Sequence, residues 1–406
     1  MLTMFAITLR EPLLTLIGGA DEGAWRTVQG NYYNAIFLTA NYFDVGFVRR
    51  GLGGSIARLF SNDPFRGALA LHALSGAYLI AAVGMIQYQL LVARQNLMAL
   101  FTAAFTILSP QLFAGWATDV GRTDMLVIGT IAWSCIALRA GRPALAAAVL
   151  TWGFLAHETS IIFGAPLALV IAAEELRQRR LTRRELVGAA ALTVSGVAAI
   201  ATLQVLCAPS ASVFLAVMQR LAPTAIDQDH ADLRDVAAYM MVLGSRGLKT
   251  AICYNLTWPG YRVMVAMSLI VTLMNCAALG LERRFLGTIL AVVMPVMFMN
   301  TVANDAGRWV KFGCANAWLL SAQFQIGNAF LEKGKRLAAR ALILLALISM
   351  GVSRDAAVNR QSIDLYGRLG FSWESVDAWM SRCDPNWRNA ARGRTDVASA
   401  VQLPSP

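Results

Sequence analysis

The sequence predicts an all-α, polytopic transmembrane helical bundle, and three observations support this prediction. Mean hydropathy is +0.54, and only 15% of the 406 residues are charged. Apolar stretches of about 16–24 residues recur along most of the chain, the length that a helix needs to cross ~30 Å of hydrocarbon. The apolar runs are continuous, which favours helices over the alternating strands of a membrane barrel. A soluble protein of this length would carry more charge.

The apolar stretches predict about eleven membrane spans. In chain order, the expected spans are 3–19, 67–93, 96–114, 124–138, 143–157, 159–174, 187–207, 258–281, 285–302, 313–331 and 337–353. Together they form one transmembrane domain, 1–353, which is followed by a tail, 354–406, that we expect to be partly flexible. The first stretch is interpreted as an uncleaved helix, because no clear Ala-x-Ala cleavage site follows it.

The basic residues set the expected orientation of the bundle. Arg94, Arg139, Arg142, the arginine run 177–184, Arg283, Arg284 and the basic residues 333–336 fall on one side. The positive-inside rule assigns that side to the cytoplasm. The external loops are then 20–66, 115–123, 208–257 and 303–312, and the tail is external too. We therefore expect a multi-pass protein of the cytoplasmic (inner) membrane whose active face is external or periplasmic.

Two short spans meet at His157 and Glu158 without a turn residue between them. If 143–174 were one long helix, the arginine run 177–184 would face outward. Placing so many arginines outside violates the charge rule more severely than two short spans do. The sequence therefore favours a helix break at His157–Glu158.

The charge and the cysteines add little about function. The net charge of +11 comes mostly from short loops between spans, where topology requires basic residues, so it does not indicate a nucleic-acid partner. The six cysteines show no paired spacing, and a disulfide bond cannot be assigned from the sequence. The sequence also lacks a phosphate-binding Gly-Lys-Ser loop and a Gly-x-Ser-x-Gly motif.

The first external loop contains a predicted amphipathic helix. Its apolar residues fall on one helical face: Phe47, Val48, Leu52, Ile56, Leu59 and Phe60. Such a helix lies flat in the membrane interface with its apolar side down. Asp44 comes directly before this segment.

One short pattern occurs three times, as Asp44-Val45-Gly46-Phe47, Asp119-Val120-Gly121-Arg122 and Asp305-Ala306-Gly307-Arg308. Each copy sits in a polar break between apolar stretches, and the expected topology places all three on the external side. Carboxylates are costly near hydrocarbon, so several of them beside arginines at one face indicate a functional centre.

The first two copies suggest specific chemistry. Asp44 is a candidate general base or metal ligand beside Arg49 and Arg50, whose guanidinium groups can bind a phosphate; the alternative is a structural ion pair. Asp119 and Asp124, with Arg122 between them, are candidates for holding a divalent cation such as Mg²⁺ or Mn²⁺, or for orienting the first site. The alternative for Asp124 is capping of the helix that it opens.

Two further places carry candidate residues. Asp305 and Arg308 repeat the acidic and basic pair near the end of the chain, where Arg308 is a candidate for binding an anionic headgroup. The alternative is an ordinary polar loop in which these two residues pair with each other. His157 and Glu158 form a pair that can move a proton or help to hold a metal ion, or simply satisfy each other at a helix break.

The order of the spans and the positions of these acidic residues resemble those of the GT-C superfamily of integral membrane glycosyltransferases. Members of this group carry an essential acidic residue in the first external loop, next to interface helices, and further carboxylates in a second external loop. Asp44 occupies the first position, and Asp119 and Asp124 occupy the second. The resemblance covers about the first 180 residues. It departs from the pattern because many members have paired acidic residues at the first site.

The resemblance implies a polyprenyl-phosphate-linked sugar donor on the external face and a glycan, lipid or protein acceptor. Asp44 would take a proton from the acceptor hydroxyl, and Arg49, Arg50, Arg122 or Arg308 would neutralise the departing lipid phosphate. Metal dependence is left open. The alternatives are a polymerase or ligase of lipid-linked polysaccharide, and a secondary transporter or flippase of envelope lipids, which would need charged residues at mid-membrane and paired broken helices.

Overall fold

The computed structural model describes residues 38, 41–44, 47, 50–93, 96–109, 112, 122–207, 252–253, 255–303, 306–327, 340–341, 343 and 383. Several predictions fall outside these residues. They are the first span 3–19, most of the loop 208–257 and of the last span 337–353, and the tail 354–406 apart from Cys383.

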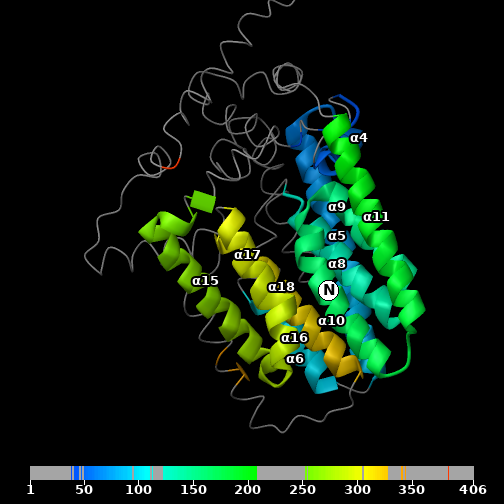
Figure 1. Ribbon diagram of the computed structural model, residues 1–406, viewed down its shortest axis with the longest axis vertical. Helices are drawn as coiled ribbons and strands as arrows, with labels where there is room; N and C mark the ends of the chain where they lie inside the picture. The colour runs from blue at the N-terminus through cyan, green and yellow to red at the C-terminus, as the bar shows by residue number, and fades with distance from the viewer. Residues whose placement is uncertain are drawn as a thin grey trace, which may run out of the picture.

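Every element within the described residues is a helix (Figure 1). In chain order they are α4 (Gly51–Phe60), α5 (Pro64–Val92), α6 (Asn96–Leu108), α8 (Asp124–Arg139), α9 (Pro143–Ala156), α10 (Thr159–Arg177), α11 (Arg183–Leu206), α15 (Pro259–Ala278), η3 (Leu281–Arg284), α16 (Phe285–Thr288), η4 (Ile289–Val293), α17 (Met294–Val302) and α18 (Ala306–Gly327).

Five of the described helical segments are long and apolar enough to cross a membrane: Arg66–Val92, Thr159–Arg177, Arg183–Leu206, Gly260–Ala278 and Phe285–Val302. The described part of the chain is thus that of a helical membrane protein, as the composition predicts. The expected total of about eleven spans includes stretches outside the described residues, so that number remains a prediction.

The predicted break at His157 and Glu158 is confirmed. Helix α9 ends at Ala156, and α10 begins at Thr159. His157 has the extended backbone angles φ −169° and ψ 138°, which reverses the chain direction between the two helices. The following helix, α11, begins at Arg183, four residues before the predicted start, because Thr182 and Glu185 form a capping box there.

One predicted boundary is wrong. The expected loop 303–312 is mostly helical, because α18 begins at Ala306 and not at residue 313. The polar residues Arg308 and Lys311 lowered the local hydropathy and hid the first two turns of this helix. Both side chains are nonetheless held inside the bundle end, where Lys311 is only 3% exposed.

A helix, α4, lies within the amphipathic segment predicted in the first loop, and it packs along α5. Its position in the membrane interface remains a prediction. Its buried residues are the small ones, Gly51, Gly53, Gly54, Ser55 and Ala57, whereas Leu59 and Phe60 at its end are exposed. The packing therefore uses small side chains, which allow the two backbones to approach closely. The exposed Leu59 and Phe60 are the apolar residues that remain for a membrane surface.

Two contacts define the two ends of the bundle. At one end, called the Asp124 end, the starts of α8 and α18 meet through Asp124 and Arg308. At the other, called the Arg139 end, the last residue of α8 contacts Glu175 near the end of α10 and the Gln323 carbonyl near the end of α18. Helices α8, α10 and α18 therefore run in the same direction, and the two turns between α8, α9 and α10 reverse the chain twice.

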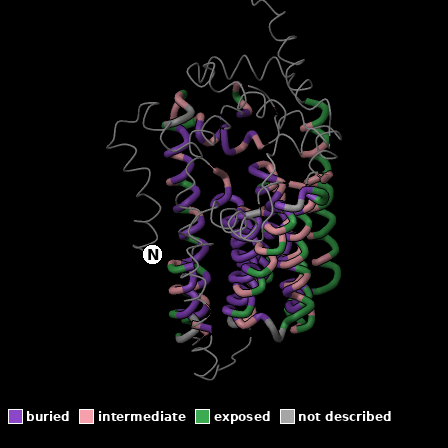
Figure 2. The backbone as a smooth tube through the Cα atoms, turned by 90° about the vertical axis from the view of Figure 1, so that its left-hand side faces the viewer, coloured by how far each residue is buried: buried purple, intermediate pink, exposed green. Residues whose placement is uncertain are grey.

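Helix α8 is the centre of the bundle and α11 is its edge. Nearly every residue of α8 is buried, from Asp124 to Leu138, whereas α11 has no buried residue and packs mainly on α9. Figure 2 shows α11 as a largely exposed helix along one side. Because α11 is apolar along its length, this exposure is the pattern of a helix facing lipid.

The helix at 285–302 is interrupted by the π-helical turn η4. Backbone groups must find partners inside the protein at membrane depth, and Asn316 of α18 provides one. Its side-chain amide donates to the carbonyl of Ala291 within η4 at 2.7 Å and to that of Phe163 in α10 at 2.8 Å. A buried asparagine thus joins three elements of the bundle.

Candidate functional site

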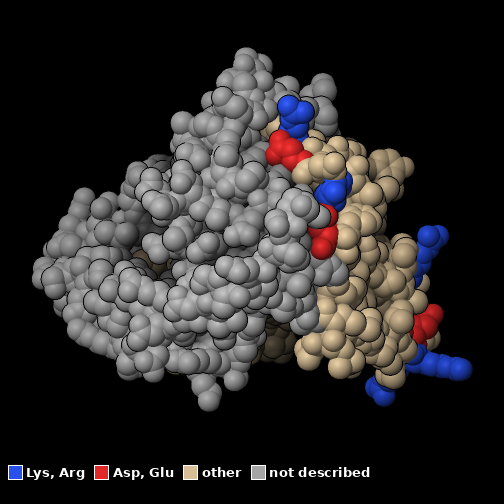
Figure 3. All heavy atoms as spheres, turned by 90° about the horizontal axis from the view of Figure 1, so that it is seen from above, with Lys and Arg blue, Asp and Glu red and all other residues tan. Residues whose placement is uncertain are grey.

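Three arginine–carboxylate pairs gather at the Asp124 end of the bundle. They are Arg308–Asp124, Arg50–Glu158 and Arg58–Asp44. Figure 3 views the molecule from above, where acidic and basic side chains lie next to each other along one edge of the described part. The residues come from the first loop, the start of α8, the α9–α10 break and the start of α18, which are far apart in the sequence.

Arg308 and Asp124 form the most enclosed of the three pairs. The Nε atom of Arg308 lies 3.0 Å and 2.9 Å from the two carboxylate oxygens of Asp124, and its Nη2 atom also donates to Oδ1. The side chains are 14% and 3% exposed, respectively. A bidentate pair of this kind is among the stronger interactions in proteins, and here it joins the first turn of α18 to the first residue of α8.

Aromatic rings surround the Arg308 guanidinium. It lies 5.4 Å from the ring centre of Trp309 and 5.9 Å from that of Phe312, within the range of cation–π attraction. Phe163 of α10 stacks on Phe312 at 5.0 Å and on Trp309 at 6.5 Å. One turn further along α18 lies Lys311, a second buried basic residue. The start of α18 therefore presents two basic groups in a mostly apolar environment.

Arg50 and Glu158 form the second pair, which joins α4 to the α9–α10 break. The Nε atom of Arg50 donates to Oε2 of Glu158 at 3.0 Å, and Nη2 donates to Oε1. Arg50 has a backbone φ of 60°, in the left-handed region that side-chain-bearing residues rarely adopt. Strain of this type is characteristic of functional and ligand-binding positions, and here it aims the side chain at Glu158.

His157 lies beside this pair and is 3% exposed. Its Nδ1 atom is 3.5 Å from Oε2 of Glu158, but it also accepts a hydrogen bond from the backbone N–H of Thr159 at 3.2 Å. The Thr159 hydroxyl also lies 2.9 Å from Nδ1. These contacts with Thr159 place the His157 ring at the start of α10.

Asp44 forms the third pair, with Arg58 of α4. The Nε atom of Arg58 donates to Oδ2 of Asp44 at 2.8 Å, and the side chains are 27% and 9% exposed. Asn41 supports the carboxylate: its amide donates to Oδ2 at 3.0 Å, and its carbonyl oxygen accepts from the Asp44 backbone N–H at 2.9 Å. The Tyr42 backbone N–H donates to Ser55 of α4 at 2.8 Å, which fixes the turn against the helix. Burial raises the pKa of Tyr42 to about 12, so its hydroxyl stays neutral.

Helix α4 also touches the turn that precedes Asp124. A Cβ atom added to Gly53 would lie only 2.5 Å from Cγ2 of Thr123, so glycine is required for this close approach. Through Gly53 and Arg50, α4 contacts both the Thr123–Asp124 turn and the α9–α10 break. The first loop and the segments predicted to form the rest of the site therefore meet.

The structure answers some of the site predictions and leaves others open. Arg50, Glu158, Asp124 and Arg308 are brought into pairs at one end. Asp44 lies at the same end, paired with Arg58 of α4, and Arg122 lies just before α8. Asp119, Asp305 and Arg49 lie outside the described residues, so their roles remain predictions.

The pairing differs from the simplest interpretation of the motifs. Arg308 pairs with Asp124, which follows another copy of the motif, and Arg50 pairs with Glu158, not with Asp44. The sequence analysis missed Arg58 as the partner of Asp44. It also missed Lys311, because the start of α18 was taken for a loop.

The carboxylates of Asp44, Asp124 and Glu158 are each engaged by an arginine. Among the described residues, no group of three metal-ligating side chains stands close enough to hold a metal ion. Both oxygens of Asp124 accept hydrogen bonds from Arg308. A role of Asp124 in binding a divalent cation would require this pair to open, and it remains a prediction together with Asp119.

The arrangement can bind and orient an anion. An incoming phosphate can take the place of a carboxylate on an arginine, because both groups accept two parallel hydrogen bonds from a guanidinium. The displaced carboxylate is then available to accept a proton. Comparison with known proteins adds no assignment, since the chain matches no protein-family model, no curated protein and no solved structure.

Proposed function

We propose that the protein is a membrane glycosyltransferase that transfers a sugar from a polyprenyl-phosphate carrier to an acceptor on the external face of the cytoplasmic membrane. The observation that supports this most is the meeting of α4, the start of α8, the α9–α10 break and the start of α18, with three arginine–carboxylate pairs, at one end of an apolar helical bundle. A lipid-linked donor needs these elements: an apolar flank for the chain, cations for the phosphate, and a carboxylate for the acceptor.

Asp44 is the proposed general base. Its carboxylate would accept the proton of the acceptor hydroxyl while that oxygen forms a bond to the anomeric carbon. The bond between the anomeric carbon and the phosphate oxygen breaks in the same step, and the electron pair leaves with the lipid phosphate. Arg58 favours the ionised carboxylate, which is the form that accepts a proton, and Asn41 holds it in place.

The departing phosphate needs positive charge, which the site supplies in two places. Arg308 is the first, because aromatic rings enclose its guanidinium and Lys311 lies one turn away. Arg50 is the second, since its pair with Glu158 is more exposed than the Arg308 pair. Cations fixed in a poorly hydrated environment stabilise charge that develops in the transition state. Arg49 and Arg122 remain further candidates for this role.

The orientation of the site is part of the proposal. The arginine-rich turns, at Arg139–Arg142 and 177–184, lie at the Arg139 end, and the positive-inside rule favours a cytoplasmic location for them. The Asp124 end would then face outward, where lipid-linked sugars serve cell-envelope polysaccharide synthesis.

The test is replacement of Asp44 by asparagine, which keeps the shape and removes the base. We expect about 10²–10⁴-fold slower sugar transfer, with lipid-linked donor accumulating at normal protein levels. Asp63→Asn is the matched control, because the Asp63 side chain is 40% exposed and its contact with Arg66, at 3.7 Å, is exposed too. Unchanged envelope glycans and donor turnover in Asp44→Asn would overturn the enzyme proposal.

Two alternatives remain. A polymerase or ligase of lipid-linked polysaccharide would use the same arginines, and the length of the product distinguishes it from a single-sugar transferase. A secondary transporter or flippase of envelope lipids is favoured by one observation, the π-helical interruption at Ile289–Val293, which packs against α18, the helix that carries the buried Lys311. Protein reconstituted into liposomes separates the classes, because a flippase moves labelled lipid without changing it, whereas a transferase consumes the donor.

A further inference from the structure

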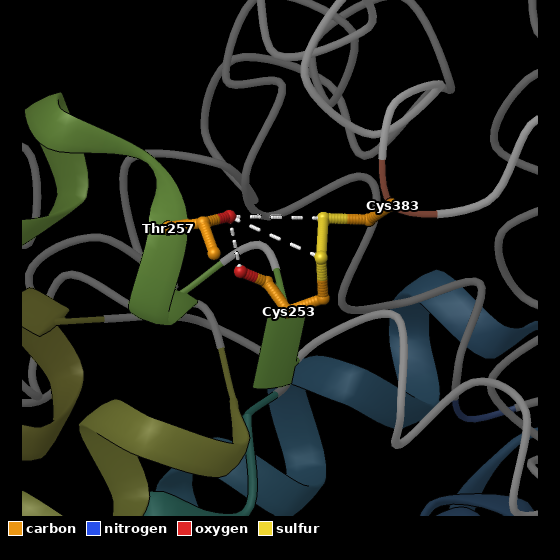
Figure 4. The surroundings of a disulfide bond; sticks show 3 residues. All are labelled: Cys253, Thr257 and Cys383. Atoms are coloured by element: carbon orange, nitrogen blue, oxygen red, sulfur yellow. Dashed lines mark hydrogen bonds between the residues drawn. A yellow bond between two sulfur atoms is a disulfide. The ribbon is translucent and has the colours of Figure 1, made fainter.

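Cys253 and Cys383 form a disulfide bond across 130 residues of sequence, with their Cα atoms 5.8 Å apart (Figure 4). The other four cysteines are free; Cys207 is exposed, and Cys135, Cys276 and Cys314 are buried. The sequence analysis could not assign this bond, because the spacing of the cysteines shows no pattern. Nothing in the proposed reaction uses it.

The bond lies at the segment that comes just before α15. The Thr257 hydroxyl donates to the Cys253 carbonyl at 2.6 Å and lies 3.8 Å from the Cys383 sulfur, as Figure 4 shows. Cys383 also packs against the buried cluster of Trp258, Tyr261 and Met264. The disulfide is therefore in contact with this buried cluster through Cys383.

The same segment holds the turn between α17 and α18. The Asn255 amide donates to the Thr301 carbonyl at 3.0 Å, and the Tyr261 hydroxyl donates to the Ala303 carbonyl at 3.0 Å. The Ala303 carbonyl also accepts from Trp309 Nε1 at 3.1 Å. Trp309 is the neighbour of Arg308, so a short series of contacts leads from the disulfide to the start of α18.

We propose that the Cys253–Cys383 disulfide is a tether that faces an oxidising compartment and positions the Arg308 end of α18. Disulfides persist where thiols are oxidised and not in the reducing cytosol. From this bond we infer that the Asp124 end is external. This inference does not use the positive-inside rule, and it does not depend on the reaction proposed above.

Formation of the bond needs a protein disulfide as oxidant. The two thiols lose two protons and two electrons, and the disulfide of the oxidant is reduced to two thiols by exchange through a mixed disulfide. Reduction reverses the step and separates Cys383 from Cys253. The contacts of Asn255 and Tyr261 with residues 301–303 do not involve the disulfide and remain.

Thiol counting on the full-length protein tests the bond. Protein from membranes is denatured and treated with N-ethylmaleimide, reduced, and then treated with maleimide-coupled polyethylene glycol. We expect two added polymer chains per protein in the wild type and in the matched control Cys207→Ser, and none in Cys383→Ser. No addition in the wild type, or an addition that persists in Cys383→Ser, would overturn the assignment.

Sealed membrane vesicles test the location. A membrane-impermeant reductant should open the bond in right-side-out vesicles and leave it intact in inside-out vesicles. Opening in inside-out vesicles alone would place the Asp124 end in the cytoplasm and overturn the proposed location.

Amide hydrogen exchange tests the positioning role without any activity assay. In Cys383→Ser we expect about tenfold faster exchange at the turn 300–309, since a constraint on its local opening is lost, and no change within α8 and α9. Cys207→Ser should match the wild type throughout. Unchanged exchange at 300–309 in Cys383→Ser would show that the bond does not position α18. These readouts leave the proposed transferase activity to be judged separately.

Discussion

The two ends of the bundle both carry arginine–carboxylate pairs, but they bury them differently. At the Arg139 end, the side chains of Arg139 and Glu175 are 6% and 1% exposed, and Arg139 also donates to the Gln323 carbonyl at 3.0 Å. At the Asp124 end, the Arg50–Glu158 pair is 27% and 20% exposed. Burial, and not residue type, separates the Arg139–Glu175 pair from the Arg50–Glu158 pair.

This difference indicates different roles for the same chemistry. The Arg139 pair has no room for a ligand and joins the ends of α8, α10 and α18, the helices whose starts carry or adjoin Asp124, Glu158 and Arg308. It fixes the spacing of the helices that carry the candidate site. The pairs at the Asp124 end are accessible enough for an anion to compete with the carboxylate. The Asp124–Arg308 pair is intermediate, since it is enclosed but still reached by solvent.

The largest effect on stability should come from the Arg139 end. Glu175→Gln leaves the buried Arg139 charge without its carboxylate, and breaking a buried pair in this way costs about 3–5 kcal/mol. We expect a clearly lower unfolding midpoint in detergent. Glu174→Gln is the control, because its partner Arg177 is 64% exposed. Equal losses in the two variants would contradict the structural role of the Arg139 pair.

A smaller loss of stability, with a larger loss of function, is expected for Asp124→Asn. The variant removes the negative charge of the carboxylate that accepts the hydrogen bonds of Arg308. Hydrogen bonds that involve a charged group contribute about 1.5–3 kcal/mol each, which sets the scale of the expected loss. Measured together, the unfolding midpoint and the rate of donor turnover should separate the two effects, with turnover falling more than the folded fraction does. A fall in turnover that only follows the amount of folded protein would make this pair a structural one like Arg139–Glu175.

The sequence predicted the helices of this bundle well, because hydropathy and chain length determine them. The starts of α8, α9 and α10 were placed correctly, and the break at His157–Glu158 followed from the charge rule. The start of α18 was missed, since Arg308 and Lys311 look like loop residues until the structure shows them enclosed. Hydropathy cannot recognise a polar helix turn that is stabilised by tertiary contacts.

The candidate site was predicted by location but not by pairing. Short motifs suggested that each arginine serves the carboxylate beside it, whereas Arg50–Glu158 and Arg308–Asp124 join residues 108 and 184 positions apart. Such pairs depend on how the helices pack, which a single sequence does not reveal. The role of Glu175 was missed for the same reason, because the arginines of the loops between helices were used only as markers of topology.

Glu158→Gln tests the more exposed Arg50–Glu158 pair against the buried Arg139–Glu175 pair. Both side chains of the Arg50–Glu158 pair are partly in solvent, so the loss of stability should be about 0–1 kcal/mol. The freed Arg50 should then bind inorganic phosphate or a phosphate analogue more strongly, because its carboxylate competitor is gone. Binding of radiolabelled phosphate to purified protein measures this, and Arg50→Gln should abolish the gain. Weaker phosphate binding in Glu158→Gln would argue against an anion site at Arg50.

The smallest effect on stability and on donor turnover is expected for Arg66→Gln. This variant serves as the reference for the other substitutions. Arg66 and Asp63 are 70% and 40% exposed and lie 3.7 Å apart, so the ion pair is fully competed by water. The free energy of unfolding should change by less than about 0.5 kcal/mol, and donor turnover should match the wild type. The pair also lies at the start of α5, next to α4, so it controls for charge removal near the site. A large effect on turnover would mean that the site extends along α5, and that exposure alone does not distinguish functional from incidental pairs.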